Sequence, residues 1–412
     1  MSKSELRING ARLWDRLMEM AKIGATPAGG SNRQALTDLD REGRDLFCSW
    51  ARNAGCSIEI DQMGNIFARR AGTDDKAAPV IAGSHLDTQP TGGKFDGVYG
   101  VLAALEVIET LNDSGTSTSR PVEAVVWTNE EGARFSPAMI GSGVLAGEFT
   151  LEYGHAATDK AGKSIGDELR RIGYAGERPC KPFPIHAAFE AHIEQGPILE
   201  ANNKTIGVVG GVQGMRWYDV IINGDAVHAG PTPMDQRKDP FRALHSILAG
   251  LYEMADRYAP QSRVTFGDIK AEPGSRNTVP ERLTLAVDLR HPNEKILEEM
   301  EGEFRAIVAG SIAAANVEGS VRVEWQSPAV EFDSGCINAV RTAAQTLGYP
   351  YLEIVSGAGH DSVYLSRIAP TSMIFVPCKD GISHNEAESA EPADLAAGAD
   401  ILLHAILERA GQ

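Results

Sequence analysis

Apolar and polar positions follow two patterns along most of the chain. In one pattern, apolar residues recur at three- and four-residue spacing, as Val98, Leu102 and Leu105 do, and this spacing is typical of a helix with one buried face. In the other, a short apolar run stops at a polar cluster, which indicates a buried strand. The two patterns predict helices over residues 5–23, 40–54, 98–111, 337–347, 361–366 and 393–409, and strands over residues 56–60, 66–70, 80–82, 122–127, 188–193, 351–355 and 372–376.

The order of elements changes near Gly210 and Gly211. From there the pattern predicts strand, helix, strand, strand, helix and strand over residues 217–223, 239–258, 264–271, 282–290, 293–315 and 321–326. That order is the ferredoxin-like βαββαβ arrangement, which forms a complete domain. We therefore expect an α/β fold in which a large domain with a central mixed sheet (residues 1–213 and 327–412) carries an inserted lid and dimerisation domain (residues 214–326). The hinges are expected at Gly210–Gly211 and near Ser327.

Composition narrows the classes of partner. A chain of 412 residues with 42% apolar content is long enough for two packed domains. Its formal net charge of −17, with no offsetting basic cluster, argues against a nucleic-acid partner. No apolar run approaches the length of a membrane span, and the first ten residues lack a secretion signal. The five cysteines are odd in number and include no CxxC pair, so we expect reduced, buried thiols in a cytoplasmic protein.

Candidate chemistry begins where the predicted strand at 80–82 runs into a loop rich in glycine. His85 and Asp87 lie two residues apart, so in an extended chain they point to the same side. Asp96 follows at the end of the loop and can reach back toward them. Because α/β folds place their sites at the carboxyl ends of strands, we expect this loop to hold a metal ion.

Other acids and histidines also sit where predicted strands end, and together they give five candidate ligands: His85, Asp96, Glu131, His192 and His384. Histidine and carboxylate without thiolate suit zinc, manganese, cobalt or nickel. Five ligands exceed the three that a catalytic zinc ion takes from the protein, but they suffice for two ions if Asp96 bridges them. Glu130, next to Glu131, is then the candidate general base that takes a proton from the attacking water and passes it to the leaving nitrogen.

Each candidate also has an ordinary structural explanation. An isolated Glu-Glu pair is usually a solvated surface feature, but Glu130 and Glu131 follow a buried strand, which favours a role in chemistry. A single histidine such as His192 is more often a hydrogen-bonded core residue. The remaining histidines apart from His228 and His360 are interpreted as structural or surface residues: His155, His186, His245, His291 and His404.

The motifs resemble those of the metal-dependent amidohydrolases and dinuclear-metal exopeptidases. They are most similar to the branch of N-carbamoyl amino acid hydrolases, allantoate amidohydrolases and yeast-type β-alanine synthase (β-ureidopropionase). The resemblance extends from about residue 80 to the C-terminus. The stretches that carry it are GSHLDTQPTGGKFDGVYGVLAALEV, VWTNEEGARF, HIEQGPILE, AVHAGPTPMDQRKDP, NTVP, DLRHP, SGAGHDS and PTSMIFVPCKDGISHNEAE.

The resemblance implies a role for each matching residue. His85, Asp96 and His192 would hold one ion, and Asp96, Glu131 and His384 the other. Asp87 would orient His85, and Glu130 would be the base. His228, on the small domain, would stabilise the oxyanion in the active site of the partner subunit. The substrate contacts implied are Gln195, His228, Asn277, Arg290 and Gly359, with His360 assisting.

The chemistry of some of these residue types agrees with those roles. The planar fork of Arg290 suits a carboxylate, and we expect Arg290 and Asn277 to anchor that of the substrate. The alternative for Arg290 is a salt bridge to a surface acid. Gly357-Ala358-Gly359 allows a backbone to approach a ligand closely, although an ordinary turn has the same composition.

We expect the protein to remove the carbamoyl group from an N-carbamoyl amino acid with the help of two divalent ions, as a homodimer that contacts through its small domain. The products would be the amino acid, ammonia and carbon dioxide. Three alternatives remain open: hydrolysis of allantoate, which is also a ureido acid; an aminoacylase or peptidase activity; and a metal-binding scaffold without turnover.

Overall fold

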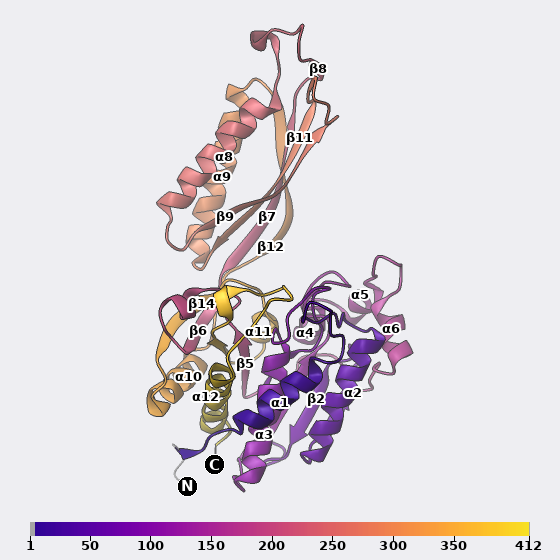
Figure 1. Cartoon of the computed structure of the whole chain (residues 1–412), viewed down its shortest axis with the longest axis vertical. Coiled ribbons are helices and arrows are strands. Elements are labelled where there is room, and N and C mark those ends of the chain that lie inside the picture. The colour runs from indigo at the N-terminus through magenta and orange to yellow at the C-terminus, as the bar shows by residue number, and fades with distance from the viewer. Residues whose placement is uncertain (1–4, 412) are drawn as a thin grey trace. The chain divides into compact units, whose positions relative to one another are not determined.

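The computed structural model describes residues 5–411 (Figure 1). Contacts between Cα atoms divide them into two compact units. The large unit contains the described residues up to Gly211 together with those from Glu331 onward, and the small unit is Val212–Val330. Each unit has its own hydrophobic core.

Nine strands in the described part of the large unit form one mixed sheet. The four strands at its centre are parallel to one another, and antiparallel strands flank them on both sides. This mixed α/β sheet confirms the fold class expected from the sequence. The strand order is β1 (Ser57–Ile60), β2 (Ile66–Arg70), β4 (Val122–Trp127), β3 (Val80–His85), β5 (Ala187–Ile193), β15 (Thr371–Val376), β6 (Ile206–Val212) and β13 (Val330–Glu331), and β14 (Tyr351–Ser356) pairs with β6.

The four central strands β4, β3, β5 and β15 end at one edge of the sheet. His85 lies opposite Trp127 in the register of β3 and β4, and His192 lies opposite Phe375 in that of β5 and β15. Every residue of these strands is buried. Burial on both faces explains why the strands read as continuous apolar runs, and the shared register places the polar residues that follow them side by side.

Helices surround this sheet. α3 packs on β3 and α12 packs on β15, and the two helices also contact each other. Their bounds are α1 (Gly10–Met20), α2 (Asp38–Asn53), α3 (Val98–Asp113), α4 (Ile140–Ala146), α5 (Leu151–Ala156), α6 (Ile165–Ile172), α7 (Ile198–Ala201), α10 (Ser334–Leu347), α11 (Asp361–Leu365) and α12 (Pro392–Ala410), with a 3₁₀ turn at Lys379–Gly381.

The structure differs from the predicted elements in two respects. The first helix is shorter than the predicted 5–23, because the side chain of Asn9 accepts a hydrogen bond from Arg12 N and caps the helix there. The short helices α4, α5 and α6 and the strand β6 were not predicted. Gly210 and Gly211, which suggested a hinge, lie inside β6. Because glycine is depleted in strands, these two residues made the sequence of β6 atypical of a strand.

The small unit is a four-stranded antiparallel sheet with two helices. Its strands lie in the order β12, β7, β11, β9, so the first strand along the chain lies between the fourth and the third, as in the predicted ferredoxin-like arrangement. The helices contribute apolar residues such as Leu244 and Phe304 to its core. The bounds are β7 (Gly214–Asn223), α8 (Pro240–Arg257), β9 (Arg263–Glu272), β11 (Arg282–His291), α9 (Glu294–Ala314) and β12 (Glu318–Ser327), with a second small ladder of β8 (Val227–His228) and β10 (Thr278–Val279) and a 3₁₀ turn at Met234–Gln236.

Two further expectations can be compared with the structure. All five cysteines are buried and none forms a disulfide, as predicted. In the part of the chain that the structure describes, every helix is too short or too polar to cross a lipid bilayer.

Candidate metal centre

The carboxyl ends of the central strands bring the five predicted ligands together. His85 ends β3 and His192 lies near the end of β5, while Asp96, Glu131 and His384 come from the loops that follow β3, β4 and β15. They form two groups, each with its ligand atoms within 4.8 Å of one another: His85, Asp96 and His192 in one, and Asp96, Glu131 and His384 in the other. Asp96 belongs to both groups, as a bridging ligand must.

The first group is fully buried. His192 Nε2 lies 3.1 Å from Asp96 Oδ1, and His85 Nε2 lies 3.7 Å from the same oxygen. The Nδ1 atoms of the two rings lie 2.8 Å from Asp87 O and 2.9 Å from Ile193 O. A backbone carbonyl can only accept a hydrogen bond, so each Nδ1 donates, and Nε2 is the ring atom that faces Asp96.

The second group lies nearer the surface. His384 Nε2 lies 3.3 Å from Asp96 Oδ2 and 3.1 Å from Glu131 Oε2, and the side chain of His384 is 51% exposed. Gln89 donates to Glu131 Oε2 through Nε2 at 2.9 Å and to Oε1 through its backbone N–H at 3.2 Å. Gln89 therefore holds the carboxylate of Glu131 toward His384.

The electrostatics of the cluster fit a bound divalent cation. Burial alone would raise the pKa of Asp96, but the hydrogen bonds from His192 and His384 hold it well below its ordinary value. Burial opposes the charge of His192, yet the bond to Asp96 outweighs it and raises the pKa of His192 to about 9. Hydrogen bonds to Asp96 and then Glu131 raise the pKa of His384 to about 10. Protons on these rings offset the negative charge of the carboxylates, as a bound cation would. The nitrogen and oxygen donors suit zinc, manganese, cobalt or nickel.

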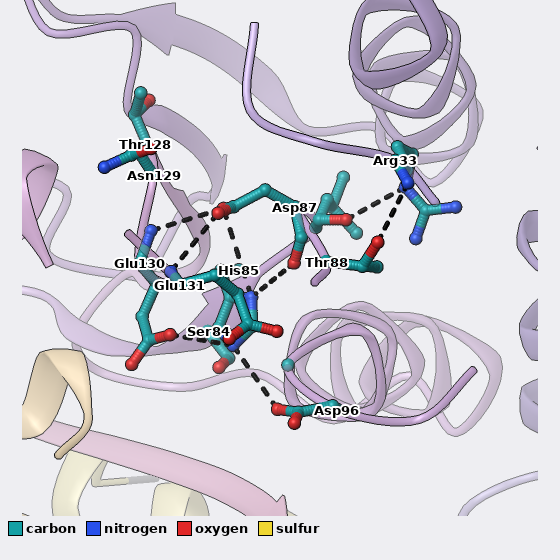
Figure 2. Close-up of polar contacts among 12 residues, drawn as sticks. Arg33, Ser84, His85, Asp87, Thr88, Asp96, Thr128, Asn129, Glu130 and Glu131 are labelled. Atoms are coloured by element: carbon teal, nitrogen blue, oxygen red, sulfur yellow. Dashed lines mark hydrogen bonds and ion pairs between the residues drawn. The ribbon is translucent and has the colours of Figure 1, made fainter. Parts of the chain in front are cut away.

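The interpretation of Glu130 and Glu131 as solvated surface acids does not fit the structure. Glu130 is 8% exposed, and its Oε2 lies 3.4 Å from His85 Nε2 (Figure 2). Burial, followed by the negative charges of Asp361, Glu131 and Asp96, raises the pKa of Glu130 well above its ordinary value. A carboxyl group with a raised pKa can accept and release a proton near neutral pH, which is what a general base needs.

Asp87 contacts His85 through its backbone carbonyl, while its side chain contacts the loop that carries Glu130. Its backbone carbonyl binds His85 Nδ1, whereas its carboxylate oxygen Oδ1 is 4.0 Å from that atom. The carboxylate instead accepts the backbone N–H groups of Glu130 at 3.3 Å and Glu131 at 3.2 Å (Figure 2). Asp87 therefore connects the end of β3 to the loop that carries the base.

The backbone is strained next to the ligands. Asn129, Gln195 and His384 have φ values of 57°, 57° and 51°, which residues with a side chain rarely adopt. Gly97 has a φ of 66°, and a Cβ built there would lie 2.3 Å from the ring of His85. Only glycine therefore lets the backbone after Asp96 pass so close to this histidine.

Three predicted substrate contacts lie in the large unit. Gln195 Nε2 donates to Asp96 Oδ2 at 2.8 Å, and its buried Oε1 has no hydrogen-bond partner within residues 5–411. His360 is buried, its ring centroid lies 4.6 Å from that of His192, and its Nε2 lies 3.0 Å from Ser356 Oγ. Burial, then the charge of His192, holds the pKa of His360 well below its ordinary value. Gly359 lies in the turn just before α11.

The other three predicted contacts, His228, Asn277 and Arg290, lie in the small unit. His228 pairs with Thr278 between β8 and β10, and Ala229 N donates to Asn277 O at 2.9 Å, so His228 and Asn277 are neighbours. Arg290 lies near the end of β11, where its Nη2 donates to Asp288 Oδ2 at 2.7 Å. Arg290 thus forms an ion pair with an acid on its own strand, and its contact with a substrate carboxylate stays a prediction.

Arg290 and Asn277 cannot anchor one carboxylate within a single copy of the chain. β10 precedes the Arg282 end of β11, and Arg290 pairs with Met215 near the other end. At about 3.3 Å per residue, Arg282 and Arg290 are about 26 Å apart. Their joint role, as expected from the sequence, would require two copies of the small unit.

Sequence reasoning missed several residues that support the centre. Gln89 and Ser383 contact Glu131 and Asp96 directly, and Glu388 binds the backbone of the loop that carries Asp96. Glu190 accepts a hydrogen bond from Ser84 Oγ at 2.7 Å. Gln89, Ser383 and Glu388 are polar residues inside motifs whose neighbours already had a role, and Glu190 lies inside a predicted strand, so the sequence signal was weak.

Comparisons with known proteins agree with this geometry. A family model described as peptidase family M20/M25/M40 matches residues 81–408. An N-carbamoyl-L-amino-acid amidohydrolase of Rhizobium meliloti is 49% identical over 98% of this chain and 97% of its own, and an allantoate amidohydrolase of Bacillus subtilis is 31% identical over 97% of both chains. The crystal structure of an amidase of the hydantoinase/carbamoylase family from Burkholderia multivorans is 54% identical over 99% of both chains, with a TM-score of 0.96.

The matched residues include all five candidate ligands and Glu130, and the match covers most of the chain. The sequence motifs, the fold and the arrangement of side chains at the ends of the central strands therefore agree with the family match. This chain belongs to the peptidase family M20/M25/M40.

Proposed function

We propose that this protein is a metal-dependent amidohydrolase that cleaves the ureido C–N bond of N-carbamoyl amino acids, giving the amino acid, ammonia and carbon dioxide. The observation that carries the proposal is the convergence of five nitrogen and oxygen ligands on a shared Asp96, beside the buried Glu130. The names of the relatives from Rhizobium meliloti and Burkholderia multivorans support the choice of substrate class.

Two divalent ions per subunit, zinc or else manganese, cobalt or nickel, would be held by the two groups that meet at Asp96. Such ions supply Lewis acidity toward the ureido carbonyl and a reactive water at neutral pH. His85 and His192 are fixed for this task by their bonds to backbone carbonyls, and Glu131 is fixed by Gln89.

Glu130 is the residue that moves the proton. It takes the proton from the attacking water and gives it to the leaving nitrogen, so that an amine or ammonia departs instead of an anion. Its raised pKa suits both steps. Asp87 keeps Glu130 in place by accepting the backbone N–H of Glu130 and of Glu131.

Gln195 supplies an acceptor suited to a ureido group. Its Nε2 is engaged by Asp96, which fixes the amide so that Oε1 is the remaining polar atom. A ureido nitrogen carries N–H donors, and a buried acceptor without a partner costs free energy until a donor fills it. We assign Gln195 Oε1 to the terminal N–H₂ of the substrate.

The small unit would bind the rest of the substrate. Arg290, held by Asp288, presents a planar fork to the carboxylate, His228 stabilises the oxyanion, and Asn277 is a further substrate contact. Because His228 and Asn277 lie at the small ladder that precedes the Arg282 end of β11, whereas Arg290 lies near the other end of β11, the proposal requires a homodimer in which His228 and Asn277 serve the partner's centre. The small unit would also act as a lid.

Allantoate is the second candidate substrate, because it is a ureido acid and because the relative from Bacillus subtilis is an allantoate amidohydrolase. The large unit offers it the same ligands and the same acceptor on Gln195. An aminoacylase or peptidase activity remains a further alternative, as does a scaffold without turnover.

A substrate panel tests the proposal directly. The zinc- and manganese-loaded protein would be assayed on N-carbamoyl-L-amino acids, N-carbamoyl-β-alanine, allantoate, N-acetyl amino acids and dipeptides. We expect kcat/KM to be highest for an N-carbamoyl amino acid. If allantoate were hydrolysed fastest, the protein would be an allantoate amidohydrolase. If the N-acetyl amino acids or dipeptides were hydrolysed fastest, it would be an aminoacylase or peptidase.

The companion variant is Glu130→Gln, with Glu152→Gln on the exposed face of α5 as the matched control. We expect the first to lower kcat by at least about 100-fold, the usual contribution of a general base, and the second to leave it unchanged. Both variants should keep their metal content. Equal activity in the two proteins would show that Glu130 is not the base and would reopen the scaffold interpretation.

A further inference from the structure

We propose that Glu388 is a positioning residue for the metal centre: its carboxylate holds the loop that carries Asp96 against the loop that carries His384. The inference rests on the metal sites of the proposed function but not on the identity of the substrate. Glu388 touches no predicted ligand side chain, and it acts through backbone N–H groups and through Ser383.

Glu388 is 4% exposed, and its carboxylate contacts both the loop that carries Asp96 and Ser383, the residue before His384. Its Oε1 accepts the backbone N–H of Phe95 at 2.8 Å and of Asp96 at 3.2 Å. Its Oε2 lies 3.0 Å from Ser383 Oγ, and the same hydroxyl lies 2.8 Å from Asp96 Oδ2. One carboxylate therefore binds the main chain of the bridging ligand and the residue just before His384.

The two loops are shaped to allow this contact. A Cβ built on Gly93 would lie 2.0 Å from the carboxyl carbon of Glu388, so the first loop passes where only glycine fits. The second loop is closed on itself, because Lys379 N donates to Ser389 O at 2.8 Å and Glu388 N to Asn385 O at 3.0 Å. Glu388 thus sits at the base of a closed loop with His384 within it.

Without Glu388, the loops that carry the second group of ligands lose the contacts that hold them together. Two buried N–H groups would have no acceptor, which is costly enough for the loop to rearrange. The first group would keep the strand positions of His85 and His192, whereas Asp96, Glu131 and His384 all lie in loops. Loss of an outer-shell partner typically weakens metal binding by 10- to 100-fold, and here the loss should fall mainly on the second ion.

The test compares Glu388→Ala with the matched control Glu391→Ala, an exposed acid that begins α12 without a side-chain capping bond. Each full-length protein is stripped of metal and titrated with zinc in competition with a chromophoric chelator. We expect the second zinc equivalent to bind about 10- to 100-fold more weakly to Glu388→Ala and unchanged to Glu391→Ala. Equal zinc affinities in the two variants would overturn the proposal.

A conservative variant separates positioning from charge. Glu388→Gln keeps an acceptor oxygen for the two N–H groups, so we expect it to recover most of the zinc affinity. If Glu388→Gln binds zinc as weakly as Glu388→Ala, the backbone contacts are not the cause and the proposal is wrong. Unfolding of the metal-free proteins in urea is measured in parallel, and a loss of stability with unchanged zinc affinity would also contradict it.

A second route remains if Glu388→Ala does not fold. Ser383→Ala removes only the hydroxyl between Glu388 and Asp96, and we expect a smaller weakening of the second zinc equivalent; no weakening would count against the proposal. Zinc binding is measured without substrate, so the two proposals can fail separately. If the protein does not hydrolyse carbamoyl substrates, the zinc titration still tests the role of Glu388. If the protein is an active carbamoylase, equal zinc affinities would still overturn that role.

Discussion

The two groups of ligands that share Asp96 are built in different ways. His85 and His192 lie on central strands, are 1% exposed, and have their rings fixed by backbone carbonyls. His384 lies in a loop, is half exposed, and is oriented by the carboxylates of Asp96 and Glu131. Two of the three ligands in the first group thus lie on central strands, whereas all three in the second group lie in loops. We expect the first to hold its ion more tightly.

The largest expected effect comes from the residue that the two groups share. Asp96→Ala removes a ligand from both groups, so we expect the purified protein to lose both ions and activity to fall by more than about 100-fold, beyond what outer-shell changes do. Metal analysis and kcat measure this. The control Asp380→Ala removes an exposed carboxylate in the 3₁₀ turn at Lys379–Gly381 and should change neither quantity.

A protein that still binds two ions without Asp96 would break the comparison, because the two groups would then be independent. One retained ion would mean that Asp96 belongs mainly to one group. Spectra of the cobalt-substituted variant identify which ion is retained.

The next effect distinguishes the two histidines. His192→Ala should cost about 2–3 kcal/mol in the free energy of unfolding of the metal-free protein, since it removes a buried and hydrogen-bonded side chain. His384→Ala should cost only about 0–1 kcal/mol, because half-exposed ion pairs contribute little. Urea unfolding of the two variants measures both changes. Equal losses in the free energy of unfolding would contradict the distinction between a first group on strands and a second group in loops.

A smaller effect is expected from pH. The pKa of His192 is raised to about 9 from an ordinary value of 6.5, because its bond to Asp96 outweighs burial. Because the folded state binds this proton more tightly than the unfolded state, protonated His192 stabilises the folded protein. This contribution to the free energy of unfolding is complete below pH 6.5 and is lost as pH rises through about 9. Metal-free protein should therefore be more stable at pH 6 than at pH 9.5, as urea unfolding at the two values would measure.

The two histidines should contribute unequally to this slope. His192→Ala should flatten the pH dependence more than His384→Ala, because the charge of a buried group is less screened. Zinc-loaded protein serves as the control, since its rings carry metal in place of protons. A slope of the opposite sign would mean that other titrating groups dominate.

The smallest effect comes from a residue that supports only the second group. Gln89→Ala removes the Nε2 contact to Glu131 but leaves the backbone contact of residue 89. We expect about a 10-fold weaker second zinc equivalent, the lower end for an outer-shell change, and no change in the first. Chelator competition measures both, and an equal loss at both sites would remove the distinction between the groups.

The sequence was most informative where strand ends carry polar residues. His85, Glu131 and His192 follow or end apolar runs, and the parallel register then brings them together without any further information. The small unit was equally accessible, because its sheet alternates buried and exposed positions along β11. Both cases depend on local patterns that survive in the folded protein.

Other features depend on contacts that a local pattern does not contain. The carboxylate of Asp87 turned out to hold the backbone of Glu130 and Glu131, and nothing in its spacing from His85 distinguishes this from the predicted contact with the ring. Glu388 lies 292 residues from Asp96 along the chain. The separation of Asn277 from Arg290 became evident only once the register of β11 was known.

The position of the ligands along the chain has a consequence for biosynthesis. His85 and Asp96 are synthesised before the inserted unit, whereas His384 is synthesised after it. A nascent chain that stops before β15 lacks both the fourth central strand and the last ligand. Completion of the second group of ligands therefore requires that the two segments of the large unit have come together across the insertion.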